Sequence, residues 1–217
     1  HRLVLRQEKV ASKSNEKTAI PELLARLELA NTLVSIDAIA CEQSNAELIV
    51  ERKGHYLLAL KKNQGLLYEQ VTQRMQQTKS QLPVDEHIDF GSGRIETRRC
   101  YVESKLSLYD DLRDWPACQR VILVEATREI NGVISQQSRY YLSDLGLSPA
   151  AFNSAVRHHW GIENQLHWYL DMVFHEDQQR VRVGNGAENF ATVRKLALQL
   201  LHRVDDKESM KSRRKLG

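Results

Sequence analysis

The first part of the chain alternates between strand-like and helix-like spacing of its apolar residues. Residues 2–10 (RLVLRQEKV) alternate apolar and polar side chains, which favours a strand. Residues 19–30 (AIPELLARLELA) place leucines at helical spacing after Pro21 and predict a short amphipathic helix. The β-branched run at 32–38 (TLVSIDA) predicts a buried strand that ends in Asp37.

The same alternation repeats immediately afterwards. Residues 45–54 predict a helix that is capped by Asn45 and stopped by Gly54. Residues 55–61 (HYLLALK) predict a second apolar strand, and residues 63–77 open another helix. Strand, helix, strand and helix at this spacing are typical of parallel βαβ units, so the pattern predicts an α/β protein.

The pattern changes after about residue 76. Residues 88–104, 119–130 and 134–145 are spaced like strands, and Asn131–Gly132 is a strong signal for a two-residue hairpin turn. The chain is therefore expected to contain an antiparallel, β-rich insertion.

Helical spacing returns in the last part of the chain. Ser148 and Pro149 are suited to the start of a long helix, and residues 183–203 supply a loop and a final helix. The basic tail that follows is expected to be disordered. These changes predict four parts, with boundaries at 1–75, 76–147, 148–203 and 204–217.

Composition narrows the class of protein only slightly. The 217 residues carry a net charge of +3, so a phosphate-binding surface would require local clustering of basic residues. Cys41, Cys100 and Cys118 form no CxxC pattern and are expected to be reduced thiols. The sequence shows neither a signal peptide nor an apolar run near the roughly 20 residues that span a bilayer. The expected location is the bacterial cytoplasm.

Two acidic residues stand out because of where the predicted elements place them. Asp37 ends an apolar strand, and parallel sheets place their ligand chemistry beyond the carboxyl ends of their strands. An Asp at this point either caps a helix or turn, or belongs to a functional site. The position of Asp37 alone favours the first interpretation, because Asp is common where strands end in turns. Glu163 lies on the long helix, in a row with His159, His167 and Asp171 at spacings of four.

The row around Glu163 has two interpretations. It is either a surface stripe of polar pairs on an ordinary amphipathic helix or the edge of a site. Trp160 and Trp168 favour the site, because tryptophan is expensive to leave on a surface. The neighbouring face of the helix is expected to dock onto a sheet through Ile162, Leu166, Tyr169, Leu170 and Val173. A zinc site is not expected, since ligands eight residues apart lie about 12 Å apart along the axis.

Two acids from distant segments that meet at a sheet edge would suit divalent-metal chemistry on phosphodiesters. Mg²⁺ and Mn²⁺ prefer carboxylate oxygens. A metal pair about 4 Å apart activates the attacking oxygen and stabilises the leaving one. Such a site usually has more than two acids.

Several long blocks of the chain resemble the H-repeat-associated (Rhs-element) transposases, an insertion-sequence group of the DDE class. These blocks are residues 33–71, 93–99 (GRIETRR), 159–201 (beginning HWGIEN) and 209–215 (SMKSRRK). The resemblance covers almost the whole chain. It implies a partial RNase H-like core, with a mixed sheet and helices, interrupted by a β-rich insertion.

The resemblance also implies a reaction. In that group, DNA is cut and rejoined at transposon ends with two divalent metal ions, Mg²⁺ or Mn²⁺, held by Asp, Asp and Glu. Asp37 matches the second Asp and Glu163 matches the Glu. The first Asp lies upstream of this sequence, so the chain is expected to be truncated, inactive in strand transfer, and unstable or self-associating because a strand edge is left unpaired.

The wider class carries Tyr, Arg and Lys around this Glu, where the present chain has Val156, His159 and Leu170. Arg157 and His159 are therefore candidates for phosphate contact. Each of the other basic residues also has an interpretation without a DNA-binding site. It belongs to a solvated turn, carries a charge that protects a strand edge from aggregation, or lies in a basic tail. The complete set of DNA-binding candidates is Lys61, Lys62, Arg94, Arg98, Arg157, His159, Arg180, Arg182, Lys211, Arg213 and Arg214.

The expected partner is the DNA of transposon ends, with self-association but neither a membrane nor a small-molecule substrate. Three alternatives stay open. The first is a nuclease of the same fold without strand joining, the second is a non-catalytic DNA-binding remnant, and the third is a structural relic of a decayed gene.

Overall fold

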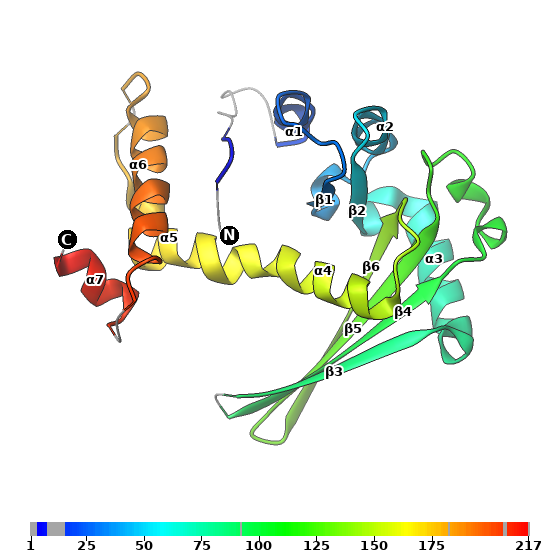
Figure 1. Ribbon diagram of the computed structural model, residues 1–217. Helices are drawn as coiled ribbons and strands as arrows, with labels where there is room; N and C mark the ends of the chain where they lie inside the picture. The colour runs from blue at the N-terminus through cyan, green and yellow to red at the C-terminus, as the bar shows by residue number, and fades with distance from the viewer. Residues whose placement is uncertain (1–3, 8–15, 92, 182, 206–207, 217) are drawn as a thin grey trace. The chain divides into compact units, whose positions relative to one another are not determined.

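A computed structural model of the chain (Figure 1) describes residues 4–7, 16–91, 93–181, 183–205 and 208–216. Its internal contacts divide the chain into two compact units. The sheet unit is Val10–Arg157, and the helical unit is His1–Lys9 together with His158–Gly217. The residues predicted as an insertion, 76–147, are thus part of the same unit as the strands before them.

The sheet unit begins with the predicted βαβ arrangement. Its first elements are helix α1 (Glu16–Ala25), strand β1 (Leu33–Ile36), helix α2 (Gln43–Glu51), strand β2 (His55–Leu60) and helix α3 (Gly65–Thr78). Strands β1 and β2 pair in parallel, with Ile36 opposite Leu58. The prediction of an α/β fold is confirmed.

Three details of this part differ from the sequence predictions. Strand β1 is half-buried along its length rather than buried. Helix α2 begins at Gln43, and Asn45 does not cap it, because its buried amide donates to the Ala40 carbonyl instead (3.0 Å). Residues 4–7 of the predicted first strand form neither helix nor strand, and the rest of that stretch lies outside the described residues.

Four longer strands continue the same sheet. They are β3 (Val84–Gly91), β4 (Arg94–Glu103), β5 (Arg120–Ile130) and β6 (Val133–Ser143), and the strand order is β1-β2-β6-β5-β4-β3. Strand β6 pairs antiparallel with β2. Asn131 and Gly132 have φ values of 51° and 78°, as a two-residue hairpin turn requires. The antiparallel strands were correctly predicted, but they extend the sheet of β1 and β2.

The two faces of the sheet bury different side chains because alternate residues of a strand point to opposite faces. Leu58, Leu123 and Leu142 belong to one core, which also contains residues of α1, α2 and α3. Ile122 and Val124 are buried on the other face. Helix α4 (Pro149–Ile162) lies on that second face, and Figure 1 shows α3 and the first part of α4 on opposite sides of the strands.

Helix α4 begins as predicted and then continues into the helical unit. The Ala151 amide donates to Ser148 Oγ (3.3 Å) at its start. After Ile162 the helix passes through a π-helical turn, Glu163–His167, into α5 (Trp168–Met172). The remaining elements are the 3₁₀ turn η7 (Glu176–Gln178), α6 (Gly186–Leu201) and α7 (Met210–Leu216).

Within the helical unit, α5 packs against α6. Leu170, Val173 and Leu198 are buried, and the rings of Tyr169 and His202 meet edge to face at 5.3 Å. Ile162, expected on the same packed face as Leu170, is 51% exposed. The π-turn between them explains the difference, since a wider turn changes the angular phase of the residues that follow it.

Two terminal segments are held on these helices. The side-chain amide of Gln7 donates from Nε2 to the Glu188 carbonyl (3.1 Å) and to Thr192 Oγ1 (2.7 Å). Lys195 Nζ donates to Gln7 Oε1 (2.7 Å). The tail, expected to be disordered, forms α7 over Met210–Leu216. The contacts of Gln7 hold residues 4–7 against α6 within the helical unit.

Candidate functional site

Asp37 lies directly after β1, at the carboxyl end of the parallel strand pair. Its Oδ1 accepts a hydrogen bond from the Ile39 amide (2.6 Å) and caps the 3₁₀ turn η1 (Ala38–Ala40). The residue is exposed. The capping interpretation of Asp37 is therefore correct, and an exposed carboxylate at this edge also leaves room for a ligand.

The loop after β2 reaches the same edge of the sheet, because parallel strands end on the same side. The Asn63 amide donates to the Ala38 carbonyl (2.6 Å), and the Gln64 amide donates to the Cys41 carbonyl. These two bonds tie the turn after Asp37 to the turn after β2. The sequence pattern did not predict this role of Asn63 and Gln64.

Lys61 and Lys62 lie in that second turn. Both are exposed. Burial, in contrast, raises the pKa of Cys41 beneath the turn to about 12, so its thiol stays protonated at neutral pH. This edge of the sheet unit thus presents one carboxylate and two ammonium groups to solvent.

Glu163 occupies the first position of the π-helical turn. Its Oε1 lies 3.2 Å from Nδ1 of His167, and both side chains are about half exposed (54% and 50%). The predicted contact between these two members of the row is present. Single π-turns inside α-helices are frequent at functional sites, because they redirect side chains from the regular helical path.

The aromatic residues around Glu163 contribute unequally. His159 and Trp160 meet edge to face at 5.3 Å, and Trp168 and Tyr169 do so at 5.0 Å. Trp168 is nevertheless 50% exposed. The argument that tryptophan is not left on a surface therefore does not hold for Trp168.

Several arginines nominated for DNA are engaged within the protein. Arg157 Nη1 lies 3.1 Å from Asp89 Oδ2 and 3.0 Å from His87 Nε2. Arg98 donates to the same Asp89 oxygen (2.9 Å) and pairs with Glu96 (3.7 Å). Arg157 and Arg98 thus share the charge of Asp89, so a DNA phosphate would have to compete with this acid for them.

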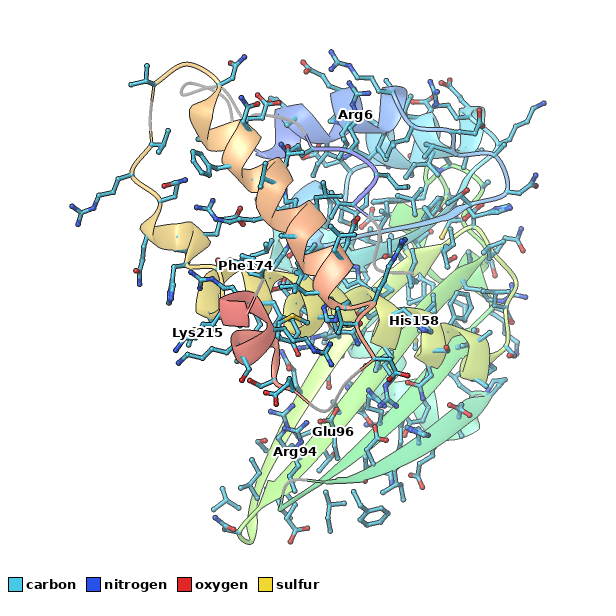
Figure 2. The ribbon with its side chains drawn as sticks, turned by 60° about the vertical axis from the view of Figure 1, so that its left-hand side comes forward. Arg6, Arg94, Glu96, His158, Phe174 and Lys215 are labelled. Atoms are coloured by element: carbon cyan, nitrogen blue, oxygen red, sulfur yellow. The ribbon has the colours of Figure 1, made fainter. Side chains whose placement is uncertain are left out.

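The tail arginines have intramolecular partners as well. Arg213 donates to the Leu201 carbonyl at the end of α6 (3.0 Å), and the Arg214 guanidinium lies over the ring of Phe174 (5.5 Å). Lys211 is exposed on the same short helix. Figure 2 shows Phe174 and Lys215 in this part of the molecule.

The other candidates are more widely spread. Arg94 is exposed near the free end of the β3–β4 hairpin (Figure 2). Arg180 is exposed after η7, and Arg182 lies outside the described residues. Sequence reasoning also missed Asp85, Asp89 and Asn153. Asp85 and Asp89 are four residues apart on a strand, and Asn153 is four residues before Arg157 on a helix, so each pair shares a face.

Asp37 belongs to the sheet unit and Glu163 to the helical unit. Among the residues that the structure describes, no three His, Cys, Asp or Glu side chains cluster closely enough to hold a metal ion. The sharing of one cation by these two acids therefore stays a prediction. None of the described helices has the length and apolar content that a bilayer crossing requires.

A family model described as "Transposase DDE domain" matches residues 1–200. The chain belongs to the DDE transposase family. This membership confirms the resemblance seen in the sequence and agrees with an RNase H-like α/β core.

Individual relatives match nearly all of this chain. The chain is 36% identical over 216 residues to "Putative protein YbfL" of Escherichia coli strain K12, which covers 93% of this chain and 55% of the relative. It is 36% identical over 228 residues to "Putative transposase YncI" of E. coli O157:H7, a match that covers 98% of this chain and 57% of the relative. It is 35% identical over 216 residues to "H repeat-associated putative transposase YhhI" of E. coli strain K12, a match that covers 93% of this chain and 55% of the relative. The chain thus spans little more than half the length of these relatives.

Proposed function

We propose that Asp37 and Glu163 are two of the three metal-binding carboxylates of a DDE transposase. The reaction they serve is metal-dependent cleavage and strand transfer of DNA at insertion-sequence ends. The observation that carries this proposal is the place of Asp37, an exposed carboxylate at the carboxyl edge of a parallel strand pair. Family membership supports Glu163 as its partner.

The donor groups fit a hard divalent cation such as Mg²⁺ or Mn²⁺. Both residues offer exposed carboxylate oxygens, which these ions prefer. One oxygen of Asp37 is held by the Ile39 amide, which sets the direction of the other. When bound, the metal pair would activate the attacking oxygen and stabilise the leaving oxygen of the phosphodiester.

Other residues of the chain have supporting roles in this proposal. Lys61 and Lys62 place positive charge at the edge that carries Asp37, where a DNA phosphate would approach. His167 orients the Glu163 carboxylate through Nδ1. The Asn63 bond to the Ala38 carbonyl keeps the two turns at this edge together.

The family set has three acids, and only Asp37 and Glu163 are matched in this chain. We therefore propose that strand transfer requires one further carboxylate in addition to these two. The chain by itself is expected to bind metal weakly and to yield no joined DNA product.

Iron-directed backbone cleavage tests the pairing of the two acids directly. Fe²⁺ in place of Mg²⁺, with ascorbate and peroxide, cuts a polypeptide close to the bound ion. Cuts are expected near residue 37 and near residue 163 in the same sample. Glu163→Gln and Asp37→Ser should each abolish both cuts. Cuts at only one of the two segments in the unsubstituted chain would contradict a shared ion.

A non-catalytic DNA-binding protein is the second candidate. It is favoured by the lack of a three-ligand cluster among the described residues, together with the exposed Lys61 and Lys62. For this candidate, Asp37→Ser leaves salt-dependent DNA binding unchanged. The unsubstituted chain then cleaves no DNA, so the substitution has no cleavage to abolish. An assay for joined products separates a transposase from a nuclease of the same fold.

A further inference from the structure

The peptide group between Ala38 and Ile39 is hydrogen-bonded at both of its ends. Its oxygen accepts from Asn63 Nδ2 (2.6 Å), and its N–H donates to Asp37 Oδ1 (2.6 Å). The side chain of Asn63 is thus joined to the Asp37 carboxylate through a single peptide group. We name this chain of two hydrogen bonds the Asn63–Asp37 relay.

A relay of this kind restrains the carboxylate in two ways. The peptide group is planar, so a donor held on its oxygen also restricts the direction of its N–H. Hydrogen bonds in a chain polarise one another, so the bond to the oxygen strengthens the N–H as a donor. Both effects act on Asp37 Oδ1, and the second carboxylate oxygen lies outside the relay.

The rest of the turn after Asp37 is held by two further amides. Gln64 Nε2 donates to the Cys41 carbonyl, and Asn45 Nδ2 donates to the Ala40 carbonyl (3.0 Å). Asn45 is 1% exposed, and its Oδ1 has no hydrogen-bond partner in the part of the chain that the structure describes. Its contribution here is therefore that of a donor to the turn. With these bonds in place, the relay starts from a backbone that is itself anchored.

The donor that begins the relay carries no charge. An ammonium group, such as that of the neighbouring Lys61 or Lys62, would form an ion pair with a carboxylate that it contacted. A carboxamide supplies an N–H without a positive charge. The relay therefore restrains Asp37 and preserves the negative charge that attracts a cation.

We infer that Asn63 is a positioning residue for Asp37 and acts on its carboxylate through the Ala38–Ile39 peptide group. Both residues and the turns that carry them belong to the sheet unit. The restraint on the carboxylate stands by itself, whereas its consequence for a metal ion rests on the proposed function.

A cycle of two substitutions, read by NMR on the full chain, tests the relay. The amide proton of Ile39 reports its bond to Asp37, and Asp37→Ala defines the position of its signal without that bond. Asn63→Leu removes the donor with little change in side-chain shape and should move the signal upfield, part of the way to that position. Adding Asn63→Leu to Asp37→Ala should move it little further, because both substitutions act on one bond.

Two further variants set the scale of the effect. Gln64→Met removes a donor to the other end of the turn and should shift the Ile39 signal less than Asn63→Leu does. Asn189→Leu makes the matched change at an exposed position of α6 and should leave the signal in place. Melting temperatures are measured for all variants, because a loss of stability alone does not change the chemical shift of the molecules that remain folded.

Additive shifts in the cycle would overturn the inference, since they would show that Asn63 acts on the peptide group without reaching Asp37. An unchanged Ile39 signal in Asn63→Leu, together with a lowered melting temperature, would overturn it as well. A shift that largely disappears in the Asp37→Ala background would support it.

Mn²⁺ added to the same samples judges the proposed function separately. Bound Mn²⁺ should broaden the Ile39 signal of the unsubstituted chain, and Asp37→Ala should abolish this broadening. Asn63→Leu should need on the order of 10-fold more Mn²⁺ for the same broadening, as when a residue that orients a metal ligand is lost. An equal requirement would overturn the positioning role. The absence of broadening in the unsubstituted chain would contradict the metal site, and the cycle would still judge the relay.

Discussion

Asp37 and Glu163 are both exposed acids, yet their surroundings differ in kind. Asp37 follows a strand that pairs with the almost fully buried β2, and its carboxylate caps the next turn with a 2.6 Å bond. Glu163 starts an irregular helical turn and contacts His167, which is itself half exposed. One acid is held by a sheet and its core, and the other by a helix.

This difference teaches that the two acids proposed for one metal site are positioned by separate means. The place of Asp37 depends on backbone pairing and on a local capping bond. The place of Glu163 within its own unit depends on the π-turn that it begins and on its contact with His167. Changes in the core should therefore affect the first acid, and changes in the π-turn should affect the second.

The largest effect is expected from the core beneath Asp37. Leu58 of β2 is fully buried and lies opposite Ile36, the residue before Asp37. Leu58→Ala should lower the free energy of unfolding by about 2–5 kcal/mol, because a cavity replaces packed atoms. Urea denaturation followed by circular dichroism measures this loss. Leu66→Ala, at a side chain that is 72% exposed, is the control and should cost under about 0.5 kcal/mol. Similar losses in both variants would contradict the assigned core.

A smaller effect is expected at the capping bond itself. Asp37→Ala removes the acceptor for the Ile39 amide and should lower the free energy of unfolding by about 0.5–2 kcal/mol. Asp37→Ser keeps an oxygen that can cap the turn and should restore most of this stability. Iron-directed cleavage should be lost in both variants, since neither retains the carboxylate. Retention of cleavage in Asp37→Ser would show that the residue only caps the turn.

The ion pairs of Asp89 with Arg98 and Arg157 should appear in the pH dependence of stability. Its pKa is lowered in the folded state, so its contribution is present above the pKa of the unfolded chain and is lost as the pH falls through the folded value. The difference in unfolding free energy between the unsubstituted chain and Asp89→Asn should therefore shrink between about pH 5 and pH 2. Urea denaturation at a series of pH values measures this difference. A constant difference over that range would argue against the ion pair.

The smallest effect on stability is expected at Glu163. Its contact with His167 is exposed, so Glu163→Gln should change the free energy of unfolding by less than about 0.5 kcal/mol. Iron-directed cleavage should nevertheless disappear. A large loss of stability in Glu163→Gln would mean that the acid serves the fold rather than a metal ion.

Much of the fold could be predicted because it is encoded in short-range patterns. The strand before Asp37, the strand at 55–61 and the turn at Asn131–Gly132 were all recognised from local spacing and turn chemistry. The predicted start of α4 at Ser148 was also correct. Each of these depends on residues that are close together in sequence.

Contacts between distant segments could not be predicted in this way. The helical tail at Met210–Leu216 has a basic, weakly apolar sequence that by itself favours disorder, and Arg213 is tied to α6 twelve residues earlier. The side chain of Gln7 is held by α6 more than 180 residues away. A pattern of single residues carries no information about such partners.

The sequence alone determined the α/β class, the two acids at an edge and on a helix, and membership of the DDE transposases, because these properties depend on local periodicity and on ordered blocks of residues. The tertiary structure decided that the antiparallel strands extend one sheet, that Glu163 begins a π-turn, and that Arg157 faces Asp89. Those outcomes depend on which distant groups satisfy one another's hydrogen bonds and charges, and that choice is made only when the chain is folded.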